Sequence, residues 1–406
     1  MALIVQKYGG SSVADADKIK NVARRIMKTR DQGNQVVVVV SAMGDTTDDL
    51  IELAQRLNPR PIEREMDVLL STGEIVSSTL LTMALHAMNC NAISLTGAQA
   101  GIETDSSYSK ARISDIKPSR IQKELKKGNV VIVAGFQGIN KGKDTTTLGR
   151  GGSDTTAVAL AASLHADQCH IYTDVEGVFT ADPRIVPEAR RLNEIGYEEM
   201  LELATWGAKV MHPRAVEIGE VYNMPIYVAC SFNENPGTLI HGGTSMEIRN
   251  KVSAIAHDMD VAKVSVMGIP DMPGIASTIF EALAKANISV DTIVQNSSVD
   301  KMADLSFTIA RNDLDKAISI VHPVAIELKS RGIAKDADLG KVSIVGTGMQ
   351  NAPGYAAKMF KTLSDSNINI EMITTSEIRI TCIIARDKVK DAVKALHKAF
   401  DLDKPA

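Results

Sequence analysis

Three glycines, an arginine and an aspartate lie close together at the start of an alanine-rich segment. The stretch TTTLGRGGSDTTAVALAASL begins at Thr145 and contains Gly149, Arg150 and Asp154. Glycines let a ligand approach the backbone closely. The helix predicted over residues 154–164 would offer an anion its unpaired N–H groups and its positive dipole end. The loop lacks the Gly-Lys-Ser/Thr of a Walker A motif and the third glycine of the dinucleotide fingerprint. It therefore predicts an anion-binding loop of another kind.

A second glycine-containing loop follows the first predicted strand. In KYGGSSVADADKI, Lys7 ends the strand and Gly9, Gly10 and Ser11 follow it. A Gly-Gly pair after a strand is often only a tight turn. Two such loops, each ahead of a predicted helix, favour a phosphate cradle with a cation beside it.

Glu74 in STGEIVSSTLL has two interpretations. It could answer a helix dipole or complete a capping box with Ser71. Alternatively, it could receive a substrate ammonium while Arg150 binds a carboxylate in bidentate fashion. A carboxylate and a guanidinium in one cleft are what an α-amino acid requires.

Two further segments carry charges next to predicted strands or turns. In TDVEGVFTADPR, Asp174, Asp182 and Arg184 either form a turn or line a nucleotide pocket with a divalent cation nearby. In WGAKVMHP, Lys209 is either a surface residue or a second cation for phosphates. The histidines show no paired spacing, so we propose no zinc or iron site.

Composition excludes several classes of protein. The chain has 406 residues and a net charge of −4, whereas nucleic-acid and membrane-surface binders carry a basic excess. No apolar run approaches the roughly 20 residues that span a bilayer. The N-terminus does not resemble a signal peptide. Four scattered cysteines fit a reducing compartment. We therefore expect a cytoplasmic protein with neither a nucleic-acid nor a membrane partner.

Buried-strand patterns alternate with helical patterns in the first half. The expected strands are LIVQKY, QVVVVVSA, NAISLTG, NVVIVAGF and QCHIYTDV, and the expected helices span residues 16–28, 62–88, 119–127 and 154–164. This alternation predicts a mostly parallel sheet covered by helices on both faces. Ligands of such sheets bind beyond the carboxyl ends of the strands, where the polar and glycine-rich loops lie.

The second half contains an internal repeat. KVSVMGIPDMPGIASTIFEALAKANISVDTI begins at Lys263, and KVSIVGTGMQNAPGYAAKMFKTLSDSNINIEMI begins at Lys341. Each copy is predicted as strand, Pro-Gly turn, helix, Asn-Ile and strand. Two copies predict two paired ferredoxin-like βαββαβ modules. A polar segment from His241 is expected to join the halves.

These motifs together resemble one family. VQKYGGSSVAD, VVVSAMGDTTDDL, LLSTGEIVSS, TTTLGRGGSDTTA, IYTDVEGVFTADPR and WGAKVMHP, in this order, resemble the amino acid kinase superfamily and specifically the aspartate kinases. The repeat is similar to the paired ACT modules of the same enzymes. The resemblance implies an amino-acid-kinase α/β sheet over residues 1–245, a linker and strand over 246–262, and ACT modules over 263–337 and 338–406.

The resemblance implies an activity and residue roles. The reaction is transfer of the γ-phosphoryl of ATP to the β-carboxylate of L-aspartate, giving 4-phospho-L-aspartate for lysine, threonine, methionine and diaminopimelate synthesis. The catalytic residues implied are Lys7 and Asp154. Mg²⁺ would be held by the ATP phosphates, without a dedicated protein ligand. The implied aspartate-binding residues are Ser41, Thr47, Glu74, Arg150, Gly151, Gly152 and Ser153. The implied nucleotide-binding residues are Lys7, Gly9, Gly10, Ser11, Thr173, Asp174, Phe179, Asp182, Arg184 and Lys209. Phe179 replaces a tyrosine that is common in the family.

The ACT modules imply feedback inhibition and a homo-oligomer. The implied effector-binding residues are Asp271, Gly274, Ala276, Gln295, Asn296, Asn367, Asn369 and Ile370. Pro-Gly and Asn-Ile are also ordinary turn and strand-start signals. Threonine is favoured because a lysine side chain would need an acidic partner, but lysine alone or both together stay open. Met246 could start a shorter subunit. Another acid-directed kinase of the superfamily and a catalytically silent amino-acid sensor are the alternative functions.

Overall fold

The chain forms two compact units that share its length unevenly. The computed structural model describes residues 1–208, 210–242, 252–297, 301–350 and 352–404. The first unit comprises Met1–Phe179, Arg191–Thr205 and Lys209–Glu247. The second unit comprises Thr180–Arg190, Trp206–Ala208 and Ile248–Ala406. The chain thus passes between the units at five junctions.

An eight-stranded sheet organises the first unit. Its order is β10-β12-β11-β9-β1-β2-β6-β3, and all neighbours are parallel except β11 and β12. The strands are β1 (Leu3–Tyr8), β2 (Gln35–Val40), β3 (Ala92–Leu95), β6 (Val130–Ala134), β9 (Gln168–Thr173), β10 (Glu194–Gly196), β11 (Ile226–Cys230) and β12 (Thr238–His241). The five strands predicted from apolar runs are β1, β2, β3, β6 and β9, so the predicted mostly parallel sheet is confirmed.

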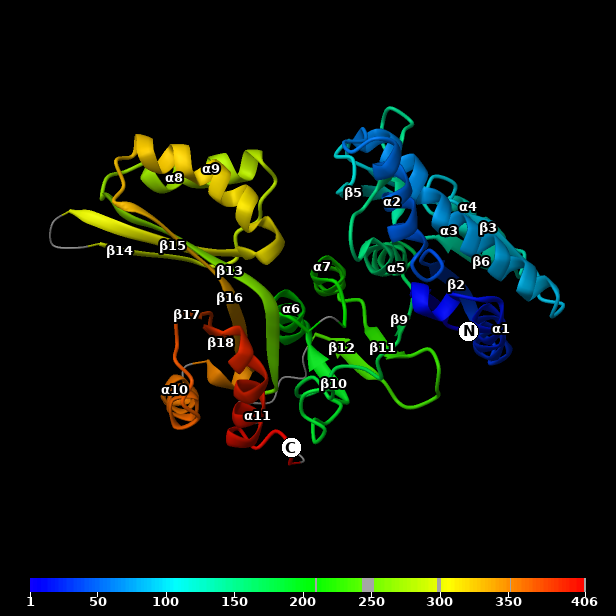
Figure 1. Cartoon of the computed structure of the whole chain (residues 1–406). Coiled ribbons are helices and arrows are strands. Elements are labelled where there is room, and N and C mark those ends of the chain that lie inside the picture. The colour runs from blue at the N-terminus through cyan, green and yellow to red at the C-terminus, as the bar shows by residue number, and fades with distance from the viewer. Residues whose placement is uncertain (209, 243–251, 298–300, 351, 405–406) are drawn as a thin grey trace. The chain divides into compact units, whose positions relative to one another are not determined.

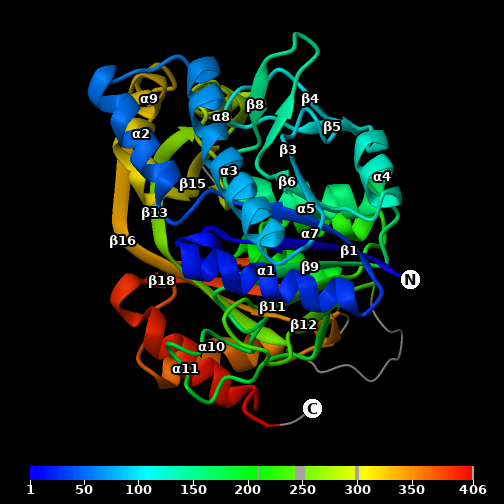
Figure 2. The ribbon, with the colours of Figure 1, turned by 90° about the vertical axis from the view of Figure 1, so that its right-hand side faces the viewer.

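Helices cover both faces of this sheet. They are α1 (Ala16–Asp31), α2 (Thr46–Leu57), α3 (Glu63–His86), α4 (Ser119–Lys126), α5 (Gly152–Ser163), α6 (Tyr197–Thr205) and α7 (Pro213–Val221). Val36, Val38 and Val40 of β2 share a core with α1 and α3, which Figure 2 shows in front of the strands. Side chains alternate along a strand, so Val37 and Val39 face the opposite side. There α5 packs against β1, β2 and β9.

A small sheet that sequence patterns did not predict completes the first unit. Its order is β5-β4-β7-β8. The strands are β4 (Ile102–Thr104), β5 (Ile113–Ile116), β7 (Gln137–Ile139) and β8 (Thr145–Thr147). Runs of three or four residues are too short to give a readable alternation. The sheet nevertheless matters, because β8 leads directly into the glycine loop.

One antiparallel six-stranded sheet runs through both repeats of the second unit. Its order is β14-β15-β13-β16-β18-β17. The strands are β13 (Ala254–Pro270), β14 (Ile293–Ser297), β15 (Met302–Ala310), β16 (Gly332–Val345), β17 (Met372–Thr375) and β18 (Arg379–Ala385). The helices are α8 (Ile275–Lys285), α9 (Leu314–Glu327), α10 (Tyr355–Asp365) and α11 (Val389–Ala399), with α8 paired with α9 and α10 with α11 (Figure 1). The predicted pair of βαββαβ modules is confirmed, and the long strands β13 and β16 serve both.

Residues from the middle of the chain complete the core of the second module. Ala181, Ile185 and Val186 belong to the hydrophobic cluster formed with α10 and α11. Thr180 fixes this segment, because its Oγ1 lies 2.9 Å from His397 Nε2. Its carbonyl oxygen also accepts a hydrogen bond from the Ile255 amide at 2.8 Å. The segment Thr180–Arg190 is therefore part of this fold.

Trp206 is the second contribution from the middle of the chain. Its ring lies 3.8 Å from the Arg379 guanidinium carbon and 4.9 Å from Lys341 Nζ, both measured to the ring centroid. Lys341 is buried and its Nζ also lies 3.2 Å from Asp291 and 3.6 Å from Asp258. Cations held over an indole face are stabilised by the ring quadrupole. The tryptophan therefore covers two basic side chains of the six-stranded sheet.

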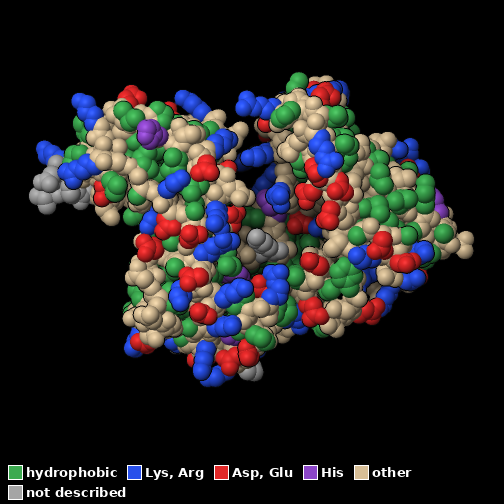
Figure 3. All heavy atoms as spheres, viewed as in Figure 1, with side chains coloured by type: hydrophobic (Ala, Val, Ile, Leu, Met, Phe, Trp, Pro, Cys, Tyr) green, Lys and Arg blue, Asp and Glu red, His purple; other side chains and the backbone are tan. Residues whose placement is uncertain are grey.

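Surface and composition give no strong sign of one partner class. Figure 3 shows basic and acidic side chains interspersed over the visible face of each unit. Within the described residues, α3 alone is long and apolar enough to cross a bilayer by length and composition. Half of that stretch is buried in the protein, and core helices of globular domains meet the same test.

Candidate active site

An ion pair joins the first strand to the helix after the glycine loop. Lys7 Nζ lies 2.6 Å from Asp154 Oδ1, and their side chains are only 11% and 12% exposed. The contact is close in distance, although it does not have hydrogen-bond geometry. Asp154 lies in the first turn of α5, where the helix dipole stabilises a carboxylate. The structure thus brings the two predicted catalytic residues together. It also places the Lys7 ammonium next to Gly9, because a Cβ added to Gly9 would lie 3.5 Å from Lys7 Nζ.

The loop after β1 packs its backbone against the loop after β2. A Cβ on Gly10 would lie 2.8 Å from the Ala42 carbonyl oxygen, so a side chain is excluded. The Gly10 carbonyl accepts a hydrogen bond from the Gly44 amide at 3.1 Å. Of the two glycines expected in the phosphate cradle, Gly9 donates its amide to the Tyr172 carbonyl at 3.2 Å. That amide is therefore engaged within the protein, while Ser11 is exposed.

The GRGG loop requires glycine for conformational and steric reasons. Gly149 and Gly151 have φ of +76° and +69°, in the left-handed region. A Cβ on Gly151 would overlap the His212 ring, and one on Gly152 would lie 2.9 Å from Leu148 Cβ. Between them Arg150 is exposed. Ser153 is buried, near the carboxyl end of β6.

His212 and Arg214, which sequence reasoning did not assign, hold this loop from the α7 side. His212 Nδ1 caps α7 by accepting the Arg214 amide at 3.3 Å. Arg214 Nη1 donates to the Leu148 carbonyl at 2.7 Å, and its Nη2 donates to the Ala111 carbonyl at 3.0 Å. Burial lowers the pKa of His212, and the nearby Arg214 lowers it further. The sequence signal was the His-Pro-Arg start of a helix.

Glu74 is a buried carboxylate in the middle of α3. The helix begins at Glu63, so the capping interpretation of Glu74 is wrong. Its Oε1 accepts the Ala42 amide at 3.1 Å. Its Oε2 is buried without a hydrogen-bond partner among the described residues. Burial raises the pKa of Glu74 to about 7, against the lowering effect of the Ala42 amide. A carboxylate in this state calls for a cationic partner.

The other predicted substrate residues lie at the ends of β2 and α2. The Ser41 amide donates to the Tyr8 carbonyl at 3.1 Å, and the Ser41 carbonyl accepts from Ser77 Oγ at 2.7 Å. Thr47 lies in the first turn of α2 and is half-buried. Ser41 and Glu74 therefore lie close together in the first unit, because Glu74 accepts a hydrogen bond from the amide of Ala42, the residue after Ser41.

The predicted nucleotide residues fall into two groups. Thr173 ends β9 and its Oγ1 lies 3.1 Å from Asp174 Oδ1, and Asp174 is exposed. Phe179 forms a β-bridge with Arg191 in the same unit. Asp182 and Arg184 lie in the second unit.

In that second group, Arg184 Nη2 donates to Asp182 Oδ2 at 2.8 Å. Arg184 lowers the pKa of Asp182 against the opposing effect of burial. Lys209 lies outside the described residues. Among the described residues, no cluster of three or more histidine, cysteine or acidic side chains could hold a metal ion by itself.

The predicted effector residues lie on turns and strand edges of the second unit. Asp271 and Gly274 precede α8, and Gln295 and Asn296 pair with β15 from β14. Ala276 lies in the first turn of α8. Asn367, Asn369 and Ile370 follow α10. Asn367 and its repeat equivalent Asn287 both have φ near +55°, at 54° and 57°. This shared helix-end conformation explains both asparagines without a ligand.

Comparison with known proteins agrees with the geometry. Residues 2–230 match the amino acid kinase family, and residues 264–324 and 342–400 match the ACT domain. The chain is 49% identical to an aspartokinase of Mycolicibacterium smegmatis over 99% of its own length and 97% of that protein. It is 50% identical to an aspartate kinase of Stutzerimonas stutzeri over 100% and 99% of the two chains.

A solved structure shares the arrangement at lower identity. The crystal structure of E. coli aspartokinase III in complex with aspartate and ADP (R-state) is 26% identical, with a TM-score of 0.83, over 98% of this chain and 99% of that one. The same enzyme in complex with lysine and aspartate (T-state) gives a TM-score of 0.76 at 25% identity over 98% and 99%. The chain therefore belongs to the amino acid kinase family and, within it, to the aspartate kinases, phosphotransferases whose acceptor is a carboxyl group.

Proposed function

We propose that this enzyme transfers the γ-phosphoryl of ATP to the β-carboxylate of L-aspartate, giving 4-phospho-L-aspartate, the first step toward lysine, threonine and methionine. The observation that carries the proposal is Glu74, a buried carboxylate with one oxygen unpartnered among the described residues. A substrate ammonium would satisfy that oxygen. The E. coli relative with aspartate and ADP bound supports the same substrate pair.

The α-amino and α-carboxylate groups of the substrate would both be held by the first unit, which leaves the β-carboxylate free to react. Glu74 would bind its ammonium, and the exposed Arg150 would bind its α-carboxylate in bidentate fashion. The left-handed backbone around Arg150 lets the loop approach closely. The remaining residues proposed to contact aspartate are Ser41, Thr47, Gly151, Gly152 and Ser153.

The chemistry requires charge stabilisation rather than a general base. A carboxylate is already a competent nucleophile, but it must approach a polyphosphate that is also anionic. Positioning and electrostatic stabilisation carry catalysis of this type. Lys7 would contact the transferring group, and Asp154 would act through Lys7 by holding its ammonium in place.

The nucleotide is proposed to lie beyond the carboxyl ends of β1 and β9. The residues assigned there are Gly9, Gly10, Ser11, Thr173, Asp174 and Phe179, and the resemblance adds Asp182, Arg184 and Lys209. Mg²⁺ bound to the phosphates would neutralise charge on the transferring group.

The ACT modules are proposed to bind an amino-acid effector and to join subunits. Threonine remains the favoured effector, with lysine alone or both together open. Glu371, next to Asn369, could have received a lysine side chain, but Lys263 Nζ already lies 3.1 Å from its carboxylate. This pairing supports threonine. The E. coli relative with bound lysine supports the alternative. A shorter subunit starting at Met246, which lies outside the described residues, is also proposed.

Hydroxylamine trapping tests the reaction. Purified protein, MgATP and L-aspartate should form aspartyl hydroxamate, and a Lys7→Ala variant should form almost none. Adding threonine, lysine and their mixture in parallel identifies the effector. Hydroxamate formed only from another acid would refute the proposed substrate. Activity unchanged by every amino acid would refute the effector site.

A further inference from the structure

One face of α3 carries a line of polar side chains. Arg64, Asp67, Ser71 and Glu74 are spaced by three, four and three residues, so they lie on the same side of the helix. Each position holds a different neighbouring segment. The Ser71 carbonyl accepts from Gln137 Nε2 of β7 at 2.8 Å, and Glu74 holds the loop after β2. The proposed ammonium ligand thus belongs to a larger set of contacts.

Asp67 is the most buried member and the most completely bonded. Its relative exposure is 0%. Both of its oxygens lie 3.0 Å from the Ser109 amide nitrogen. Oδ2 accepts the Thr147 amide at 2.9 Å, and Oδ1 accepts Thr147 Oγ1–H at 2.6 Å. Within the described chain, no lysine or arginine forms an ion pair with it. Burying a carboxylate whose partners are only N–H and O–H donors costs free energy. The hydrogen bonds that offset this cost hold the segments around Ser109 and Thr147 firmly.

The two segments that Asp67 holds flank the base of the glycine loop. Thr147 ends β8 and precedes Leu148 and Gly149, where the backbone turns into the loop carrying Arg150. A Cβ on Gly149 would lie 3.1 Å from the Ser109 carbonyl oxygen, so this strand end packs directly on Ser109. Asp67 therefore fixes both sides of the entry to the loop.

Asp67 and Glu74 lie seven residues apart on one rigid helix, a rise of about 10 Å. One helix thus carries the proposed ligand for the substrate ammonium and the anchor of the loop that binds the substrate carboxylate. We propose that Asp67 is a positioning residue that fixes the loop carrying Arg150 relative to Glu74, and so sets where the substrate's α-amino and α-carboxylate groups are held. From that fixed point the side-chain carboxylate of aspartate reaches the transferring phosphoryl group, whereas an acid longer by a methylene does not fit the same distance. This inference rests on the proposed function. A displacement of about 1 Å at a reacting centre can cost up to roughly 100-fold in rate.

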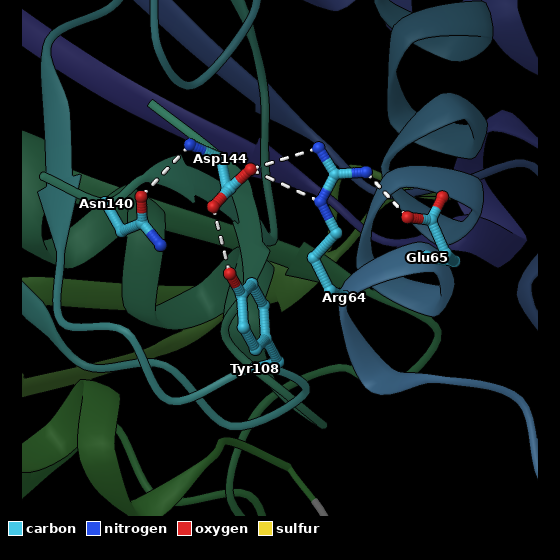
Figure 4. Close-up of polar contacts among 5 residues, drawn as sticks. All are labelled: Arg64, Glu65, Tyr108, Asn140 and Asp144. Carbon is cyan, nitrogen blue, oxygen red and sulfur yellow. Dashed lines mark hydrogen bonds and ion pairs between the residues drawn. The ribbon is translucent and has the colours of Figure 1, made fainter. Parts of the chain in front are cut away.

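Arg64 provides a matched control on the same face. Figure 4 shows its guanidinium between Glu65 and Asp144. Its Nη2 donates to Asp144 Oδ1 at 3.0 Å, and Tyr108 Oη donates to Asp144 Oδ2 at 3.0 Å. The Asp144 amide donates to Asn140 Oδ1 at 3.0 Å. This partly exposed network holds the β7–β8 turn, not the strand end that enters the glycine loop.

The test compares Asp67→Asn, Thr147→Val and Arg64→Gln with the parent enzyme. Asp67→Asn places an amide donor against the Ser109 and Thr147 N–H groups, whereas Thr147→Val removes only one hydrogen bond. For each, kcat and the KM values for aspartate and ATP are measured, together with hydroxamate yields from L-aspartate and L-glutamate and the Tm.

Asp67→Asn is expected to lower kcat/KM for aspartate about tenfold or more, to leave KM for ATP within twofold, and to reduce the preference for aspartate over glutamate. Thr147→Val should change kcat/KM for aspartate and the preference for aspartate in the same direction but by less. Arg64→Gln should leave both at the parental values. If Asp67→Asn does not fold, Thr147→Val alone decides. A lower Tm with parental KM and parental preference would overturn the inference, as would equal rises in both KM values. A parent enzyme that forms no aspartyl hydroxamate would overturn the proposed function as well.

Discussion

If Glu74 binds the substrate ammonium as proposed, we predict that aspartate binding depends on pH near neutrality. Burial raises the pKa of its carboxyl from 4.5 to about 7 in the free enzyme. Only the ionised form can receive the substrate ammonium. KM for aspartate should therefore rise as pH falls through about 7, by about tenfold between pH 8 and pH 6, because the ionised fraction falls in that proportion. KM for ATP should stay nearly constant.

The same shift has a consequence for stability. Raising the pKa of Glu74 from 4.5 to about 7 corresponds to about 3 kcal/mol of free energy. The raised pKa means that the native chain binds more protons than the unfolded chain between the two values. This contribution to the free energy of unfolding is therefore full below about pH 4.5 and is lost as pH rises through about 7. A bound ammonium should restore much of it.

Steady-state kinetics from pH 6 to pH 8.5 on the parent and Glu74→Gln provide the assay. The variant should show a raised KM for aspartate at every pH and no acid limb. Urea unfolding of both proteins should give a stability difference that changes by about 3 kcal/mol between pH 4 and pH 8. Burial lowers the pKa of His212 below its usual 6.5 and that of His170 to about 4, so both histidines titrate below the limb expected for Glu74. An acid limb retained in Glu74→Gln, or a KM independent of pH in the parent, would refute the reasoning.

Four further substitutions test other parts of the protein. Lys7→Ala should lower kcat by about 100- to 1000-fold, because a cation at the developing charge is lost, and an unchanged kcat would refute its placement. Gly151→Ala should raise KM for aspartate and lower the free energy of unfolding by about 1–3 kcal/mol, measured by urea titration. Because the His212 Cβ would also overlap the added methyl group, His212→Gly should relieve part of that loss in a double-mutant cycle, whereas strict additivity would count against the overlap. Gln295→Ala should abolish effector inhibition while leaving uninhibited kcat intact, and a loss of kcat would make the residue structural.

Local patterns predicted the central parallel strands, and singled out charged residues beside the glycine loops, for clear reasons. The parallel strands are continuous apolar runs, and the glycine loops lie where a parallel sheet places its ligands. Lys7, Glu74 and Asp154 stood out because they occur beside those loops or within an apolar helix. The strands and loops were predicted from short-range spacing, whereas the roles of Lys7 and Asp154 came from the family resemblance.

The supporting residues could not be found in this way. Asp67 is bonded to Ser109 and Thr147, which are 42 and 80 residues away in the chain. His212 matters because it packs on Gly151, which the sequence places in another motif. Asp67 stands between Met66 and the apolar run VLL (residues 68–70), which was a signal for a buried carboxylate, but only tertiary contacts identify its partners.

The five junctions between the units limit how these enzymes can be recombined. A regulatory half exchanged between two relatives at a single cut near residue 250 would leave Thr180–Arg190 and Trp206–Ala208 behind. The transplanted sheet would lose Ile185 and Val186 from its core, and the indole over Arg379 would come from the recipient. A chimaera should therefore take both short segments from the same parent as the second unit. A polypeptide beginning at Met246 would lack them and would have to obtain equivalent core residues and an equivalent indole from another chain.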